Sequence, residues 1–400
     1  MRRARYFPAS VFLLALTAAG HSGATDFDAC LDRLSSEASA AGVGQGTINN
    51  ATASVSRNER VLELDRQQPE FLQTFGRYLE TRLSQQRIRR GRELLDEHAE
   101  LLRSVQQDFG IPAPYLVAFW GLETNFGGYF GDFPVLDALA TLACDTRRSE
   151  FFSAQFVEAL ALIDRDQMRQ EQMRGSWAGA MGHTQFLPET ARRHGIDYDG
   201  DGRIDLWNSL PDAMASAANY LRAMGWNEGE RWGREVRLPD DFPLQESGID
   251  TRKPLREWSA LGIRRADGQS LPDTDIRAAL LLPSGFTGPA FLVYPNFHII
   301  MRWNPSTAYA LSVGLLADQI AGGDGLVRQP PDEEPLSREQ VRELQGRLNA
   351  LGHDSGRPDG IAGRMTRGAV REYQRQAGLP ADGHPNRALL DRLRRQERDG

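Results

Sequence analysis

The sequence feature that most constrains the fold is a short segment, residues 113–125 (APYLVAFWGLETN), which is apolar on nearly every side. Gly110 and Pro112 end the helical pattern before it, and Pro114 suits the first turn of a new helix. A helix with apolar side chains around its whole circumference is stable only when other elements surround it. We therefore expect a domain of many helices that encloses this segment.

The sequence around this segment supplies further helices and one region of different character. Apolar residues recur every three or four positions, which predicts amphipathic helices, over 27–110, 151–172, 210–224 and 306–320. Between residues 234 and 303, glycines and prolines separate short β-rich runs. These runs, which predict a small β-containing insertion, are residues 279–282, 290–294 and 298–303.

The C-terminal part of the chain reads as a separate small domain. Residues 322–335 (GGDGLVRQPPDEEP) have no apolar periodicity and are rich in glycine, proline and acid, which predicts a linker. Residues 336–395 carry three helical stripes and two Asp-Gly turns, at Asp359 and Asp382, so this module resembles an imperfect internal duplication. The expected domains are 1–24, 25–321, 322–335 and 336–395.

The N-terminus has the order of a secretory signal. Three arginines precede an apolar stretch and then small residues, and cleavage is expected near Ala24. The alternative is an uncleaved membrane anchor. In an exported chain we expect the two cysteines, Cys30 and Cys144, to form a disulfide, with buried or unpaired thiols as the alternative. The 47 basic and 54 acidic residues give a formal charge of −7, which excludes a general nucleic-acid binder.

The most unusual carboxylate is Glu123, in the stretch FWGLETNFG at the end of the apolar helix. Burial among aromatic side chains disfavours the charged form of a carboxylate. We therefore expect the pKa of Glu123 to be raised, which would make it a proton donor near neutral pH. The alternative is a structural glutamate paired with a buried arginine.

Residues 176–186 (SWAGAMGHTQF) combine small side chains with polar ones. Small residues let a backbone or a ligand approach closely, and Ser176 and Gln185, next to Phe186, can hydrogen-bond a polar substrate. A tightly packed turn without a ligand is the alternative.

Residues 197–205 (DYDGDGRID) match the first half of an EF-hand calcium loop. The twelfth position holds Asn208 in place of the usual glutamate, so Asp212 is the expected closing carboxylate. Hard oxygen ligands suit calcium and argue against zinc. The alternative is a metal-free turn held by local hydrogen bonds. The candidate ligands are Asp197, Asp199, Asp201, Arg203 and Asp212.

Aromatic and amide side chains surround a predicted helix start at residues 303–309 (WNPSTAY). Trp303, Asn304 and Tyr309 lie in this stretch, and Tyr220 lies on the helix after the acidic loop. Aromatic faces with a few amides suit a saccharide site, although core packing is the simpler explanation for any single ring.

Together these residues resemble the lytic murein transglycosylase B family. The resemblance covers nearly the whole chain after the N-terminal segment, through residues 62–98, GLETNFG, SWAGAMGHTQFLPET, LWNSLPDAMASAANYL and NFHIIMRWNPSTAYA. The tail, with RELQGRLNALG and its Asp-Gly turns, resembles a peptidoglycan-binding module. The resemblance implies a mainly α protein: a lysozyme-like helical catalytic domain with a small β-containing subdomain, plus a C-terminal three-helix peptidoglycan-binding module.

The resemblance also implies a function. The chain would cut peptidoglycan glycan strands between N-acetylmuramic acid and N-acetylglucosamine, leaving 1,6-anhydro ends, with Glu123 as sole catalytic acid. No cofactor is implied for the chemistry, and calcium would be structural. Where the family often has a tyrosine, this chain has Trp303, which keeps the aromatic surface without the hydroxyl. The implied substrate-binding residues are Ser176, Gln185, Phe186, Tyr220, Trp303, Asn304 and Tyr309.

A periplasmic monomer is expected, with peptidoglycan as partner, other cell-wall enzymes as further candidate partners, and no nucleic acid. Two rival functions stay open at this point. One is a hydrolytic muramidase that uses the same glutamate and water. The other is a non-catalytic wall-binding protein.

Overall fold

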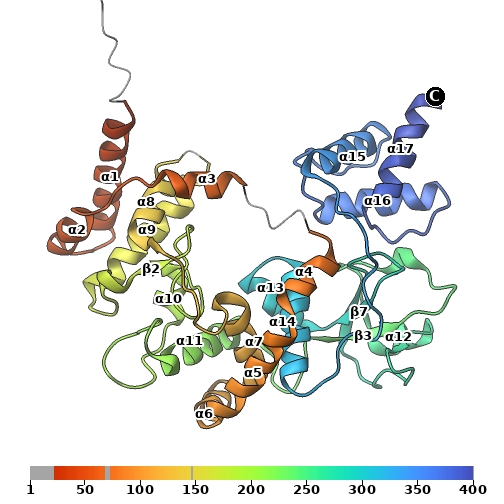
Figure 1. Cartoon of the computed structure of the whole chain (residues 1–400), viewed down its shortest axis with the longest axis horizontal. Coiled ribbons are helices and arrows are strands. Elements are labelled where there is room, and N and C mark those ends of the chain that lie inside the picture. Colours follow the sequence, from red (N-terminus) through yellow and green to blue (C-terminus); the bar gives the residue numbers. More distant parts are fainter. Residues whose placement is uncertain (1–21, 68–72, 146, 400) are drawn as a thin grey trace, which may run out of the picture.

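The computed structural model describes residues 22–67, 73–145 and 147–399 (Figure 1). The predicted signal sequence, residues 1–24, lies almost wholly outside the described residues. The chain is mainly α with two small sheets, as the sequence predicts. None of the described helices is long and apolar enough to cross a membrane.

The predicted apolar helix forms and is buried. It is α7, Ala113–Thr124, and eight of its residues are buried. It packs mainly against α14, Thr307–Ile320, and α5, Gln85–Glu97. We call the surrounding cluster the first core. Its other helices are α4 (Phe75–Arg82), α6 (Ala99–Phe109), α11 (Leu210–Ala223) and α13 (Pro295–Trp303).

A second helical core lies beside the first, on the left of Figure 1. Its centre is the pair α8 and α9, which pack against each other. The long first helix covers one side of this pair. The helices of the second core are α1 (Ser22–Ala40), α2 (Gln45–Thr52), α3 (Glu59–Gln67), α8 (Val135–Ala143), α9 (Ser149–Asp164) and α10 (Pro188–His194).

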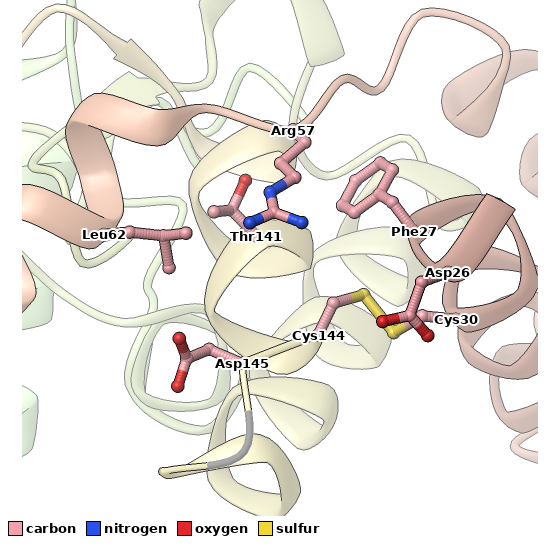
Figure 2. A pocket seen from close by; sticks show the side chains of 8 residues that line it. All are labelled: Asp26, Phe27, Cys30, Arg57, Leu62, Thr141, Cys144 and Asp145. Carbon is pink, nitrogen blue, oxygen red and sulfur yellow. A yellow bond between two sulfur atoms is a disulfide. The ribbon is translucent and has the colours of Figure 1, made fainter. Parts of the chain in front are cut away.

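A disulfide joins α1 to the end of α8. The sulfurs of Cys30 and Cys144 are 2.06 Å apart, and the two residues are 114 positions apart in the sequence. Figure 2 shows the bridge at one side of a small pocket, with Phe27 above it in this view and Arg57 entering from the loop before α3, its guanidinium beside Thr141. The bridge therefore ties the first described helix to the middle of the second core.

The β-containing insertion forms a five-stranded antiparallel sheet in the order β4-β6-β7-β3-β5. The short helix α12, Leu255–Ala260, and the sheet share a third core. Strands predicted over 279–282 and 290–294 are confirmed as β6 and β7. The five strands are β3 (Gly233–Arg237), β4 (Arg252–Pro254), β5 (Arg264–Arg265), β6 (Arg277–Leu281) and β7 (Ala290–Val293).

The prediction of a third β-run at 298–303 is wrong, because these residues belong to α13. Pro295 occupies the first turn of that helix, where its missing N–H costs nothing. Phe297 and Ile300, three positions apart, are both fully buried, so the apolar spacing is helical. The helix predicted over 151–172 is also shorter than expected, since α9 ends at Asp164.

The C-terminal module consists of α15 (Arg338–Ala350), α16 (Arg364–Gln376) and α17 (Arg387–Asp399) around its own core. Its two halves contain the same hydrogen-bond pattern, which we call the clasp: a helix glutamine bonded to the aspartate and the glycine of an Asp-Gly turn. Gln345 donates to Asp359 Oδ1 at 3.0 Å and accepts from the N–H of the following glycine. Gln374 does the same with Asp382, at 2.8 Å. This shared clasp supports the internal duplication inferred from the sequence.

The segment between the two domains, residues 322–335, has no helix or strand, but it is hydrogen-bonded to the large domain. The Glu235 carboxylate accepts hydrogen bonds from the N–H groups of Val327 and Arg328, both at 2.8 Å. The module itself touches the large domain, since Asp382 Oδ2 accepts from the N–H of Phe286 at 3.0 Å. The module is therefore docked and not merely tethered.

Candidate active site

Glu123 lies one residue before the end of α7, on a turn of unusual backbone shape. The three residues that follow the helix, Asn125, Phe126 and Gly127, all adopt left-handed conformations with φ of 51°, 61° and 78°. This conformation is costly for a residue with a bulky side chain such as Phe126. Phe126 N–H donates back to the Trp120 carbonyl at 3.2 Å, so the chain reverses directly after the carboxylate. Glu123 is half-buried at this reversal.

Tyr309 holds the carboxylate from the opposite helix. Its hydroxyl donates a short hydrogen bond to Glu123 Oε1. Tyr309 lies in the first turn of α14, where the Ser306 hydroxyl caps the helix by accepting from the Tyr309 N–H. Burial, followed by the negative charge of Glu123, raises the pKa of Tyr309 well above its ordinary value. The phenol therefore keeps its proton and acts as a donor to Glu123.

A histidine that the sequence reasoning did not single out fixes the turn after Glu123. His183 Nδ1 accepts a hydrogen bond from Trp120 Nε1 at 2.8 Å. Burial lowers the pKa of His183 to about 4, so the ring is neutral and its Nδ1 can accept. A side-chain carbon on Gly127 would lie 2.5 Å from the His183 ring, which is why glycine stands there.

Thr124 adds a second tie between the same two segments. Its hydroxyl accepts from Gly127 N–H at 3.0 Å and lies 3.3 Å from the His183 carbonyl. The two-stranded sheet of β1, Phe133–Pro134, and β2, Arg174–Gly175, adds a third connection. The turn carrying Glu123 is therefore joined to the loop at 176–186.

Within that loop, the two predicted polar ligands make local hydrogen bonds. The Ser176 hydroxyl accepts from the N–H groups of Ala178 and Ala180 at 3.3 and 3.1 Å. Gln185, itself left-handed with φ of 49°, donates through Nε2 to the carbonyls of Phe130 and Gly182, both at 3.1 Å. These contacts shape the loop, and the substrate-binding roles of Ser176 and Gln185 stay predictions.

The predicted aromatic residues do come together. The Trp303 ring lies 5.1 Å from that of Phe186, 5.3 Å from that of Tyr220 and 4.4 Å from that of Phe119. Phe119 in turn lies 6.4 Å from Tyr309, which links the cluster to the partner of Glu123. Phe186 and Tyr309 are buried, whereas Trp303 and Tyr220 are half-exposed. Only the latter two have ring surface left for a ligand.

Asn304 and Tyr220 are also anchored by the backbone. Asn304 Oδ1 accepts from the Ser306 N–H at 3.1 Å, just before α14 begins. The Tyr220 hydroxyl donates to the Arg302 carbonyl at 2.9 Å. Both contacts fix the segment between α13 and α14 that carries Trp303.

The acidic loop brings together three of its predicted ligands. Carboxylate oxygens of Asp197, Asp199 and Asp212 lie within 4.8 Å of one another. Asp212 is fully buried, and this burial raises its pKa in spite of three backbone N–H donors. Asp201 is outside this group of three, and its Oδ1 accepts from the Arg203 N–H at 2.9 Å.

The chain is similar to proteins of known family. Residues 26–318 match the family model described as the transglycosylase SLT domain, and residues 337–393 match that of the peptidoglycan binding domain. Membrane-bound lytic murein transglycosylase B of Escherichia coli (strain K12) is 32% identical over 247 residues, which are 61% of this chain and 67% of that protein.

Solved structures of lytic transglycosylases are also similar to this chain. SltB3 from Pseudomonas aeruginosa, in complex with NAG-anhNAM-pentapeptide, is similar at a TM-score of 0.89 and 46% identity, over 92% of this chain and 99% of that one. The Escherichia coli lytic transglycosylase Slt35, in complex with calcium, is similar at a TM-score of 0.63 and 29% identity, over 74% of this chain and 92% of that one.

Proposed function

Because the chain belongs to the transglycosylase SLT family, and is thus a lytic transglycosylase acting on peptidoglycan, we propose that Glu123 alone supplies its acid and base. The bond cut is the β-1,4 link from N-acetylmuramic acid to N-acetylglucosamine. The observation that carries the proposal is the buried Tyr309 hydroxyl donating to Glu123 on the strained turn after α7. Strained backbone that its surroundings hold in place is typical of catalytic positions.

The reaction proceeds in two proton transfers. Protonated Glu123 donates to the glycosidic oxygen as the bond to the muramoyl C1 breaks. The N-acetyl group of the substrate stabilises the cationic centre. The carboxylate then removes the proton of the muramoyl C6 hydroxyl, whose oxygen bonds to C1. Water is not consumed, Glu123 regains its proton, and the product carries a 1,6-anhydro end.

Tyr309 contributes to the middle of this cycle. A hydrogen bond donated to an ionised carboxylate stabilises it more than one donated to the neutral acid. Tyr309 therefore favours the carboxylate that exists between the two proton transfers. This is the species that must persist until the C6 hydroxyl attacks.

The remaining predicted residues bind the sugars. The half-exposed rings of Trp303 and Tyr220 offer stacking surfaces, with Phe186 packed behind them. Ser176, Gln185 and Asn304 lie on turns whose hydrogen bonds hold them in place, and they provide polar contacts to the N-acetyl and hydroxyl groups.

Product analysis tests this function. The wild-type protein and Glu123→Gln are incubated with purified sacculi, and the released muropeptides are examined by mass spectrometry. Anhydro ends from the wild type and no release from the variant are expected. Glu100→Gln, an exposed glutamate on α6, is the matched control and retains activity. Reducing ends would favour the hydrolytic muramidase, and unchanged release by Glu123→Gln would remove Glu123 as the acid.

The acidic loop fits structural calcium. Asp197, Asp199 and Asp212 offer clustered carboxylate oxygens, and Arg203 offers its carbonyl at the seventh loop position. The buried Asp212 carboxylate gains most from a cation, because burial otherwise disfavours its charge. Calcium should raise the melting temperature of the wild type but not of Asp212→Asn. No rise at millimolar calcium would refute the site.

The domain boundaries and cellular location complete the proposal. Residues 1–24 act as a signal for export to the periplasm, residues 25–321 form the catalytic domain, and residues 336–395 bind the wall beyond the 322–335 linker. The enzyme acts as a monomer on glycan strands, with other cell-wall enzymes as candidate partners. N-terminal sequencing of the mature protein tests the cleavage site.

A further inference from the structure

Two arginines flank the Glu123–Tyr309 pair, at the junction of α4 and α5. The Arg82 guanidinium lies 5.1 Å from the ring centroid of Tyr78, and its positive charge acts on Tyr309. Arg87 Nη2 lies 3.5 Å from Oδ1 of Asn125, two residues after Glu123. Both side chains are half-buried, so their charges are only partly screened by water.

Among the described residues, neither arginine has a carboxylate partner. Arg87 Nη1 donates to the carbonyls of Thr81 and Arg82 at 2.9 and 2.8 Å, while its buried Nε has no acceptor. Burial and the charge of Arg82 lower the pKa of Arg87, which places the two cations close to each other. Neighbouring half-buried cations repel, and a bound anion would offset that cost.

The two arginines differ in what they do locally. Arg87 uses Nη1 to cap the last carbonyls of α4, and one of those carbonyls belongs to Arg82 itself. Arg87 is thus a positioning residue that fixes the end of α4. The Arg82 guanidinium donates no hydrogen bond to any described residue, and it lies over the face of the Tyr78 ring. Its planar donors are free to take an anion.

We propose that Arg82, positioned by Arg87, binds a carboxylate of the peptide stem and makes the enzyme prefer glycan that carries stems. The inference rests on the proposed role of Glu123. The muramoyl sugar whose bond is cut bears the peptide, so a stem carboxylate comes close to the catalytic glutamate. A guanidinium pairs with a carboxylate through two parallel hydrogen bonds, which an ammonium cannot reproduce.

The test compares two substrates of equal glycan length: one with peptide stems, and one from which an amidase has removed them. Arg82→Gln should lower kcat/KM on the stem-bearing chain about 10- to 100-fold more than on the denuded chain, mainly through KM. Arg82→Lys keeps the charge but not the planar donors, so it should restore the preference only in part. Arg89→Gln removes an exposed arginine of α5 and serves as the control.

The ratio of the losses on the two substrates decides whether Arg82 binds the stem. An equal loss on both substrates would mean that Arg82 acts only on the catalytic pair or on folding, and would overturn the inference. No loss on either substrate would overturn it too. Failure of the proposed function would look different, because the wild type would then leave reducing ends on both substrates while the ratio between them remained measurable.

Discussion

Replacing Tyr309 by phenylalanine removes one hydroxyl from the buried side of Glu123 and keeps the ring. The lost interaction is a hydrogen bond to an ionised group, worth about 1.5–3 kcal/mol. If Glu123 accepts this hydrogen bond mainly as the carboxylate that exists between the two proton transfers, kcat should fall about 10- to 100-fold. In the resting enzyme the proposed mechanism has Glu123 protonated, so the bond lost there joins neutral groups and is worth about 0.5–1.5 kcal/mol. Only 6% of Tyr309 is exposed and its ring still packs against Phe119, so the free energy of unfolding should fall by no more than this amount.

The pH dependence separates this role from a structural one. Tyr309 favours the ionised form of Glu123, so without the hydroxyl the protonated acid persists to higher pH. The alkaline limb of the pH–rate profile should therefore move to higher pH, even though the maximal rate is lower. Release of anhydro-muropeptides from sacculi between pH 4 and pH 9, together with thermal melting, measures both quantities.

A matched control is available on α7. Tyr115 is also a buried tyrosine, and its hydroxyl accepts from the Trp232 N–H at 3.1 Å, away from the carboxylate. Tyr115→Phe should lower stability by a comparable amount and leave the pH profile in place. If Tyr309→Phe kept both its rate and its profile, or lost activity only in step with folded protein, the assignment of Tyr309 would be wrong.

Three further perturbations follow from the fold. Reducing the bridge between Cys30 and Cys144 frees a loop of 114 residues, so urea titration should show a loss of about 4–5 kcal/mol; a loss below 1 kcal/mol would contradict the bridge. His183 binds its proton less readily in the folded protein than in the unfolded one. Stability should therefore fall as pH drops from about 6.5 towards 4, by at most about 3 kcal/mol, and His183→Asn should flatten that slope. Asp382→Ala should release the C-terminal module, seen as a larger radius of gyration in X-ray scattering, whereas Asp359→Ala breaks the equivalent clasp without touching the large domain and should not.

The elements that the sequence predicted correctly are those set by local spacing. The helix around Glu123 follows from apolar residues on all its sides. The clustering of Asp197 and Asp199 follows from their alternate positions in a known loop pattern, while their role as metal ligands stays a prediction. The prediction of a strand at 298–303 was wrong because short apolar segments fit a strand or a helix equally well. There the proline at position 295 was the deciding signal, and the prediction did not weigh it.

The contacts that make a site of these elements are not local. Tyr309 meets Glu123 across 186 positions, and His183 meets Trp120 across 63. Spacing carries no information about such pairs. The residue pattern and the family resemblance both pointed to Tyr309 as a sugar-binding residue, and neither predicted its hydrogen bond to Glu123. His183 could have been found as the one titratable group inside a stretch of small residues. Arg82 offered no signal in the sequence, because its proposed role depends on its forming no ion pair with any described residue, which spacing does not reveal.

The candidate site spans the two helical cores, which explains why so many of its residues make structural hydrogen bonds. Glu123 sits on a helix of the first core, and the loop at 176–186 packs into the second. Tyr220 and Trp303 contact both cores, so the two half-exposed rings form the seam between them. A shift of one core relative to the other would displace the proposed sugar-stacking rings with respect to the proposed acid, Glu123. The bonds of Ser176, Gln185 and His183 are therefore part of how the acid is held, since each fixes the loop against which α7 ends.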